Sequence, residues 1–213
     1  MNAPRHPSWL VLIVALASTP LALTASQPFL QRVEAVDHVL LETNNDLALA
    51  PDHVLVVCFP TPGHPEAIDR AVALRRDGKN RWRLTYAAAL PARAPGEFRR
   101  EERALDPAIA TNVLAIFRHL LETETLAATG ALHRPSADDD AWILLRDRSP
   151  ALAAVARNSA LAATSGDDVQ VYRDLCAGLV GLFVAPPGEQ EIALTQLDRF
   201  AAAYVAGHPL ARP

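Results

Sequence analysis

Hydrophobic positions follow strand-like patterns in the first half of the chain and helix-like patterns in the second. Residues 53–59 (HVLVVCF) form an apolar, β-branched run without polar alternation, which is typical of a strand covered on both faces. Residues 142–145 (WILL) predict another short strand. Strands followed by helices predict an α+β fold, in which a small, mainly antiparallel sheet is covered by helices mostly from the C-terminal half.

The best-defined local motif is a hairpin over about residues 67–88, which turns near residues 76–80 (RDGKN). Its apolar positions are Ile68, Val72 and Leu74 on the outgoing strand, and Trp82, Leu84 and Tyr86 on the returning strand. Opposite residues of an antiparallel pair point to the same side, so these even-numbered positions meet only across a loop with an odd number of residues. A three-residue loop with a bulge, in which Gly78 or Asn80 is left-handed, meets this condition, whereas a two-residue turn at residues 77–78 does not.

Apolar residues at three- and four-residue spacing predict the helices. These are residues 28–43, a helix that begins at Asp106 and Pro107, and residues 149–163, 165–184 and 189–206. The helix at Asp106 is the best defined, because Asp is a favoured N-cap and Pro is favoured at the first helical position. Its expected buried stripe is Ile109, Val113, Ile116, Phe117 and Leu120, and its expected exposed side carries Thr111, Arg118 and Glu122.

The N-terminus has the pattern of a secretory signal peptide. A basic start precedes an apolar run at residues 9–17, and small residues lead to an expected cleavage point after Ala25. The alternative is an uncleaved membrane anchor, which Pro20 disfavours because proline breaks a helix interior. We therefore predict a signal peptide over residues 1–25, one α+β domain over residues 26–213, and export to the periplasm or out of the cell.

Composition and charge exclude some classes of partner. Half of the 213 residues are hydrophobic, which is enough to build one globular core. Removal of the signal peptide takes away one arginine and moves the formal charge from −4 to −5, which argues against nucleic-acid binding. We expect no membrane contact after cleavage. Charge is uneven, since residues 66–103 carry ten basic and six acidic residues.

This basic region contains the candidate binding surface. On the side of the hairpin opposite its apolar face lie Arg75, Arg81 and Arg83, and the next segment adds Arg99, Arg100 and Arg103. Arginine forks bind carboxylates and phosphates through paired hydrogen bonds, so the expected partner is another periplasmic protein with an acidic surface. The alternative is a solvated outer face, partly neutralised by the glutamates at positions 97, 101 and 102.

The chain lacks the short motifs of common catalytic and nucleotide-binding sites, including GxSxG, GxxxxGK[ST], GxGxxG, HExxH and CxxC. We therefore expect no cofactor and no metal site, and whether the protein is an enzyme stays open. His119 and Glu122 have a metal-compatible spacing on one helix but lack a second half-site. The leading hypothesis is an exported interaction or accessory protein. The alternative is a periplasmic hydrolase whose dispersed site uses His53, His64 and the aspartates at positions 138–140.

The two cysteines, Cys58 and Cys176, suggest a disulfide. An even cysteine count in a protein sent to an oxidising compartment favours pairing. Cys58 lies in the buried strand and Cys176 lies on the apolar arc of the helix over residues 165–184, so both are expected to point inward. The alternative is two buried thiols that pack as small hydrophobic side chains.

Overall fold

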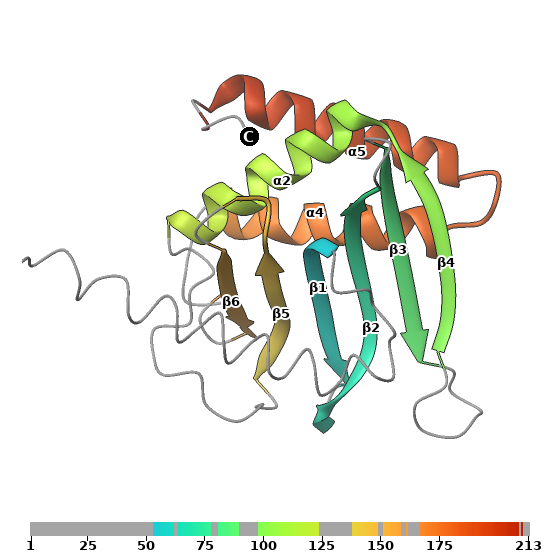
Figure 1. Cartoon of the computed structure of the whole chain (residues 1–213), viewed down its shortest axis with the longest axis vertical. Helices are drawn as coiled ribbons and strands as arrows, with labels where there is room; N and C mark the ends of the chain where they lie inside the picture. The colour runs from blue at the N-terminus through green and yellow to red at the C-terminus, as the bar shows by residue number, and fades with distance from the viewer. Residues whose placement is uncertain are drawn as a thin grey trace, which may run out of the picture.

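The computed structural model describes residues 53–61, 64–77, 81–89, 98–123, 138–148, 151–158, 161, 167–208 and 210. Six antiparallel strands form one sheet in the order β4-β3-β2-β1-β5-β6, and the described helices pack against it, which confirms the α+β class (Figure 1). The strands are β1 (His53–Thr61), β2 (His64–Arg76), β3 (Trp82–Ala89), β4 (Phe98–Leu105), β5 (Asp139–Leu145) and β6 (Leu152–Arg157). The helices are α2 (Pro107–Glu122), α4 (Asp167–Val184) and α5 (Gln190–Gly207). The predicted signal peptide and the predicted helix over residues 28–43 lie outside the described residues.

Strands β2 and β3 form the predicted hairpin, and their register has the predicted parity. Leu74 pairs with Leu84, and even-numbered positions face one another along the whole ladder. The backbone N–H of Asp77 donates to the carbonyl oxygen of Arg81 at 2.9 Å, which leaves three residues in the loop. The predicted left-handed residue is one of those three and lies outside the described residues.

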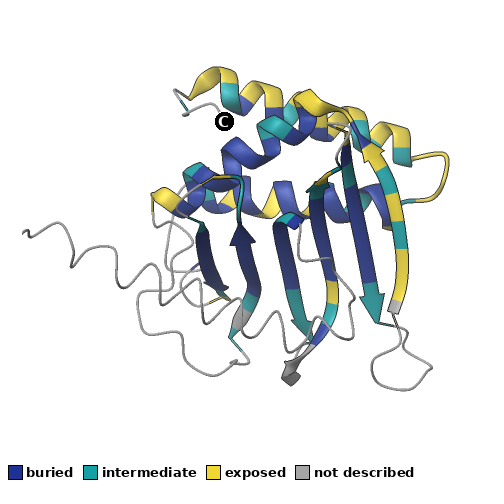
Figure 2. Cartoon of the chain, in the orientation of Figure 1, coloured by how far each residue is buried: buried dark blue, intermediate teal, exposed yellow. Residues whose placement is uncertain are grey.

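Each face of the sheet carries a hydrophobic cluster, and the two clusters are separate. The larger cluster lies between the sheet and the helices and draws residues from every strand and every described helix. The smaller cluster lies on the opposite face and contains Val56, Cys58, Ile68, Ala71, Ala73, Ala87, Trp142, Leu144, Ala153 and Val155. Figure 2 shows the resulting burial along the central strands. The sheet therefore separates two apolar interiors.

Ile68 does not share the face predicted for it. Phe59 pairs with Arg70, but the next residue of β1, Pro60, pairs with Ile68, so Asp69 is an extra residue in β2. A β-bulge of this kind changes the side to which the preceding side chains point. Ile68 consequently packs in the smaller cluster, away from the other apolar residues of the hairpin.

Helix α2 begins as predicted but buries more of its surface than predicted. The Asp106 carboxylate accepts a hydrogen bond from the backbone N–H of Ala108 at 2.7 Å, which caps the helix. Every residue of the predicted stripe is buried. Arg118, predicted to be exposed, has only 4% of its side chain exposed. It is buried because the carboxylate of Asp147, just after β5, binds its guanidinium.

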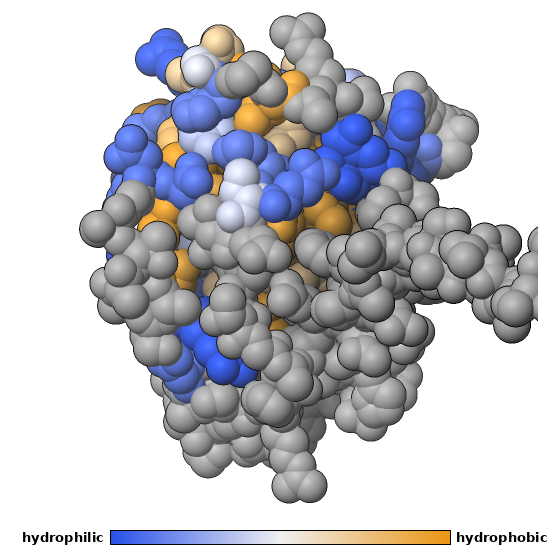
Figure 3. Space-filling model, turned by 90° about the vertical axis from the view of Figure 1, so that its left-hand side faces the viewer, coloured by the Kyte–Doolittle hydropathy of each residue, from blue (hydrophilic) through white to orange (hydrophobic). Residues whose placement is uncertain are grey.

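The helix predicted over residues 149–163 is wrong. Residues 152–157 instead form β6, which pairs antiparallel with β5 from Leu145–Leu152 to Asp139–Arg157. Alanine favours helices in isolation, but here alternate side chains enter the two clusters on opposite faces of the sheet. Burial on both faces therefore outweighs local propensity. On the side of the molecule nearest β6, hydrophilic and hydrophobic residues are interspersed over the described surface (Figure 3).

The two C-terminal helices have the predicted order and nearly the predicted limits. Helix α4 ends at Val184 as expected, whereas the predicted cap at Ser165 lies outside the described residues. Its apolar arc is buried, and Phe183 stacks on Tyr86 of β3 with ring centroids 5.2 Å apart. Helix α5 follows Glu189 and contacts both α2 and α4. Among the described helices, none combines the length and the apolar character needed to cross a membrane.

Candidate functional site

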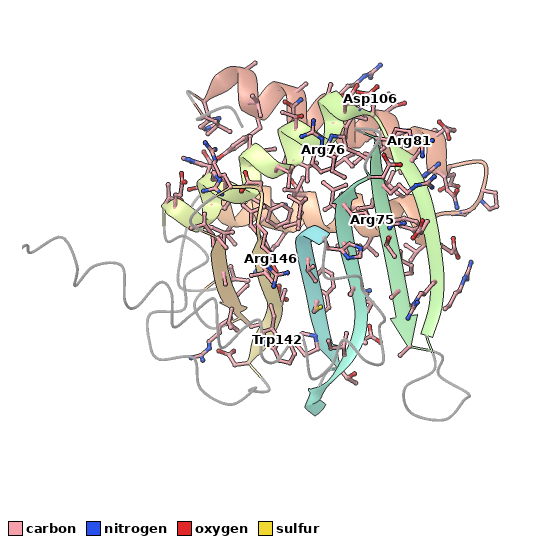
Figure 4. The ribbon with its side chains drawn as sticks, viewed as in Figure 1. Arg75, Arg76, Arg81, Asp106, Trp142 and Arg146 are labelled. Atoms are coloured by element: carbon pink, nitrogen blue, oxygen red, sulfur yellow. The ribbon has the colours of Figure 1, made fainter. Side chains whose placement is uncertain are left out.

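We define the arginine-bearing hairpin face as Arg75 of β2, Arg83 of β3, and Arg100 and Glu102 of β4. Arg75 pairs directly with Arg83, and Arg100 stands opposite Ala87, a member of the smaller cluster. Their side chains therefore lie on the sheet face away from the helices. Figure 4 labels Arg75 on the strands, farther from Asp106 at the start of α2 than Arg76 and Arg81 are.

One carboxylate serves two of these arginines. Nη2 of Arg75 donates to the two oxygens of Glu102 at 3.2 and 3.3 Å, and Nη1 of Arg83 lies 3.9 Å from Oε2 of the same glutamate. Arg100 is exposed and forms no ion pair with another described residue. The Nε atom of Arg75 is buried, and no described group accepts its hydrogen bond. The face therefore keeps an excess of positive charge and one unused donor.

The other predicted arginines serve different purposes. Arg81 binds Asp77 across the hairpin loop, through Nε at 2.8 Å and through its backbone N–H at 3.1 Å. Arg99 and Arg103 occupy odd-numbered positions of β4, which point toward the helices, and Arg103 donates to the carbonyl oxygen of Leu182 at 3.0 Å. The arginines that share the hairpin face are Arg75, Arg83 and Arg100.

The residues predicted for a dispersed hydrolase site lie at both ends of β1. His53 is buried at the start of β1. Asp140 lies at the start of β5, near the other end of β1, because the two strands are antiparallel and Trp142 stands opposite Cys58. His64 is the first residue of β2, and its side chain lies outside the described residues. His53 and Asp140 are thus separated by most of the length of β1, whereas His64 begins β2 opposite Thr61, at the same end of the sheet as Asp140.

Asp140 lies instead in a pocket against α4. The register between β5 and β6 shifts at this residue, which is a bulge that turns its side chain toward the helix. The hydroxyl of Tyr172 donates to Oδ2 of Asp140 at 2.7 Å. Burial raises the pKa of Tyr172 and the pKa of the neighbouring Cys176 thiol far above their ordinary values. Both groups are therefore protonated at neutral pH, which disfavours a role as nucleophile or general base.

The predicted disulfide is absent from the structure. Cys58 and Cys176 are both buried and both free. Cys58 belongs to the smaller cluster and Cys176 belongs to the larger, so the sheet lies between the two thiols. Both side chains do point inward, as expected, but they enter different interiors. The structure agrees with the alternative, in which each cysteine packs as a small hydrophobic residue.

A buried ion pair is the main polar feature that the sequence analysis missed. Nε of Arg118 lies 3.1 Å from both oxygens of Asp147, and Nη1 donates to Glu122 at 3.1 Å. Burial by itself lowers the pKa of Arg118, but its hydrogen bonds to the two carboxylates raise it above the ordinary value. The available signal was the position of Arg118 between the apolar residues Leu114 and Leu121, four residues before it and three after it.

His119 and Glu122 do not form a metal site. The His119 ring lies 6.3 Å from the ring of Tyr204 and 6.2 Å from that of His208, measured between centroids. Glu122 is bound to Arg118. Within the described ranges there is no group of three or more His, Cys, Asp or Glu side chains that could hold a metal ion.

Comparison with known proteins adds no functional assignment. No protein-family model, no curated protein and no solved structure matches this chain. Two regions of the molecule have features that suit binding, the arginine-bearing hairpin face and the pocket at Asp140.

Proposed function

We propose that this is an exported interaction or accessory protein, which binds another periplasmic protein through the arginine-bearing hairpin face. One observation carries the proposal. Arg75, Arg83 and Arg100 stand on the same side of three adjacent strands, and the described strands place a single carboxylate, Glu102, among them. An acidic surface on the partner would supply the missing negative charge.

Because this face is exposed, a carboxylate of a partner protein can replace Glu102 as the group that binds these arginines. The side chains of Arg75 and Glu102 are 28% and 42% exposed, so their ion pair contributes little to folding. A partner carboxylate can therefore approach the guanidinium groups without a large loss of stability. Arginine forks also give directional, bidentate contacts, and exposed charges accelerate encounter.

A hydrolase with a dispersed site is the second hypothesis. Its support is the pocket that contains Asp140 and Tyr172. Against it, His53 lies at the other end of β1, and burial keeps the Tyr172 hydroxyl protonated. The separation of His53 from Asp140 favours binding over catalysis, because general acid–base chemistry requires hydrogen-bond reach between the two groups.

The proposal can be tested with two charge-matched variants of the chain that begins at Ser26. The test variant is Arg83→Glu with Arg100→Glu, which leaves the buried part of Arg75 in place. The control is Arg199→Glu with Ala202→Glu and Ala203→Glu, which places the same total change of charge on three exposed positions of α5. A partner captured by the wild-type protein from periplasmic extract is purified, and its association rate with each variant is measured by surface plasmon resonance.

The test variant should associate at least about tenfold more slowly at low salt, whereas the control should resemble the wild type. The difference should shrink at 1 M salt, where the screening length falls to about 3 Å. Circular dichroism checks that both variants are folded. Equal association rates for the two variants would contradict binding at this face. A wild-type association rate that does not depend on salt concentration would contradict it as well.

A further inference from the structure

A pocket lies on the helix-covered face of the sheet, opposite the hairpin face. It has a volume of about 380 Å³ and opens between α4 and the ends of β1, β2 and β5. Its lining includes Phe59, Arg70, Asp140, Arg173, Val180 and Val184. This volume lies at the small end of the range of small-molecule sites, which is about 300–1,000 Å³. The pocket is therefore large enough for a small organic molecule.

One β-bulge places a charged group in this pocket. The bulge in β5 lies at Asp140, whose carboxylate meets Tyr172 of α4. Bulges re-aim side chains and are frequent next to binding sites. The extra residue in β2, Asp69, lies directly before Arg70, but Arg70 keeps the regular register of the hairpin opposite Ala88 and so lies on the helix-covered face.

The pocket is lined by two arginines, Arg70 and Arg173, and one aspartate, Asp140, so its formal charge is positive. The carboxylate of Asp140 already accepts a hydrogen bond from Tyr172 at 2.7 Å. The Arg70 guanidinium lies over the Phe59 ring, 5.2 Å from its centroid, and its contact with Asp69 is long, at 3.8 Å. Exposed pairs at such a distance are weak.

The second cation of the pocket is Arg173 of α4. Its side chain is exposed and forms no ion pair with another described residue. Arg70 and Arg173 can therefore both donate to an anionic group of a ligand.

The rest of the pocket is apolar. Phe59 and Val180 form part of its wall, and Val184 at the end of α4 is 59% exposed. Exposed apolar side chains beside polar groups are typical of ligand-binding sites. A hydrocarbon group placed here would remove their surface from water.

We infer that this pocket binds a small organic acid that carries one carboxylate on an apolar body. The carboxylate pairs with the guanidinium groups of Arg70 and Arg173, and the apolar body lies against Phe59, Val180 and Val184. The site is separate from the proposed protein interface, because it uses the helix-covered face of the sheet and a different class of ligand.

Octanoate and 1-octanol make a direct test, because they differ in the carboxylate and share the apolar chain. Isothermal titration calorimetry of the chain that begins at Ser26 should detect saturable octanoate binding, with 1-octanol weaker by about tenfold or more. The variant Arg70→Gln with Arg173→Gln should weaken octanoate binding by about the same factor and leave 1-octanol unchanged. Arg199→Gln, an exposed arginine of α5 outside the pocket, should leave both unchanged.

A second variant tests the pocket itself. A Cβ atom added to Gly181, which lines the pocket, meets no atom within 4 Å. Gly181→Phe should therefore occupy the cavity and abolish binding of octanoate and of 1-octanol, whereas Gly181→Ala should retain binding. Circular dichroism establishes whether each variant is folded. If Gly181→Phe unfolds, the Arg70→Gln with Arg173→Gln variant decides the result, because both of its substitutions are at exposed positions.

Three results would overturn the inference. The first is no saturable octanoate binding at millimolar concentration. The second is equal affinity for octanoate and 1-octanol, which would mean that the arginines do not recognise a carboxylate. The third is unchanged octanoate affinity in the folded Arg70→Gln and Arg173→Gln double variant. Failure of these tests would leave the hairpin-face proposal untouched, since that proposal rests on Arg75, Arg83 and Arg100.

Discussion

Arginine–carboxylate pairs occur in two contrasting settings in this protein. Arg118 and Asp147 lie between α2 and the end of β5, and each side chain is only 4% exposed. Arg75 and Arg83 share Glu102 on the open side of the hairpin, where the three side chains are between 28% and 42% exposed. The chemical groups are the same, and the environment differs.

Burial decides what each pair can do. Removal of one member of a buried pair leaves a charge without compensation, so Arg118 and Asp147 hold α2 against the sheet. An exposed pair is solvated and weak, and it can exchange one carboxylate for another at little cost. The buried pair therefore serves the fold, and the exposed arginines are available for recognition.

The largest effect should follow loss of the buried carboxylate. Asp147→Ala should lower the free energy of unfolding by about 3–5 kcal/mol, because the guanidinium of Arg118 stays buried without its main partner. Glu122→Ala is the control, since that partner is 49% exposed, and it should cost less than about 1 kcal/mol. Urea denaturation measures both. Similar losses in the two variants would remove the distinction between buried and exposed pairs.

The two sides of the hairpin should differ nearly as much. Trp82→Ala should lower the free energy of unfolding by an amount near the lower end of about 3–5 kcal/mol. The ring packs in the larger cluster, but 9% of the residue remains exposed. Arg83→Ala, the next residue on the open side, should cost less than about 1 kcal/mol. Equilibrium unfolding of both variants checks this order. A larger loss for Arg83→Ala would show that the open side contributes to the core.

Tyr204 is intermediate between the buried and the exposed ion pairs, and its contribution to the free energy of unfolding can be measured as a function of pH. Its hydroxyl donates to Asp168 at 3.2 Å, and burial together with that carboxylate raises the pKa of Tyr204 to about 12. The folded state thus holds the proton more tightly than the unfolded chain, whose tyrosine pKa is about 10. The resulting stabilisation is complete below pH 10 and is lost between about pH 10 and 12, by about 1 kcal/mol at pH 11. Unfolding of the wild type and Tyr204→Phe at pH 9 to 11 should show a steeper loss in the wild type, and parallel curves would refute the shift.

The smallest effect on stability should come from Glu102. Glu102→Gln removes the shared carboxylate of an exposed pair, so the free energy of unfolding should change by less than about 1 kcal/mol. The same change increases the positive charge of the hairpin face and should speed association with an acidic partner. Denaturation and surface plasmon resonance measure the two effects. A large loss of stability with no change in association would make this cluster structural.

Some features could be derived from the sequence because they depend on neighbouring residues. Asp106 caps α2 through a side-chain contact only two residues away. The register of the hairpin follows from the alternation of side chains and the odd number of loop residues. That alternation also placed Arg75 and Arg83 together on the open face. Local steric and hydrogen-bonding rules were sufficient for each.

Other features depended on contacts between distant parts of the chain. Residues 152–157 became β6 because β5 and two apolar clusters were present to bury it. The position of Arg100 on the open face required the pairing of β3 with β4. The position of Asp140 in the pocket required the bulge in β5, and a bulge arises from the register between strands, which the spacing of residues in one segment does not reveal.

The cysteines and Arg118 illustrate the limit of the sequence. Apolar patterning determined that Cys58 and Cys176 are buried, and only the sheet decided that they lie on opposite sides of it. Helical spacing placed Arg118 among exposed residues, and only the arrival of Asp147 after β5 made its burial favourable. Periodicity specifies which side of an element avoids water. Tertiary packing decides which other element covers that side and which charges meet there.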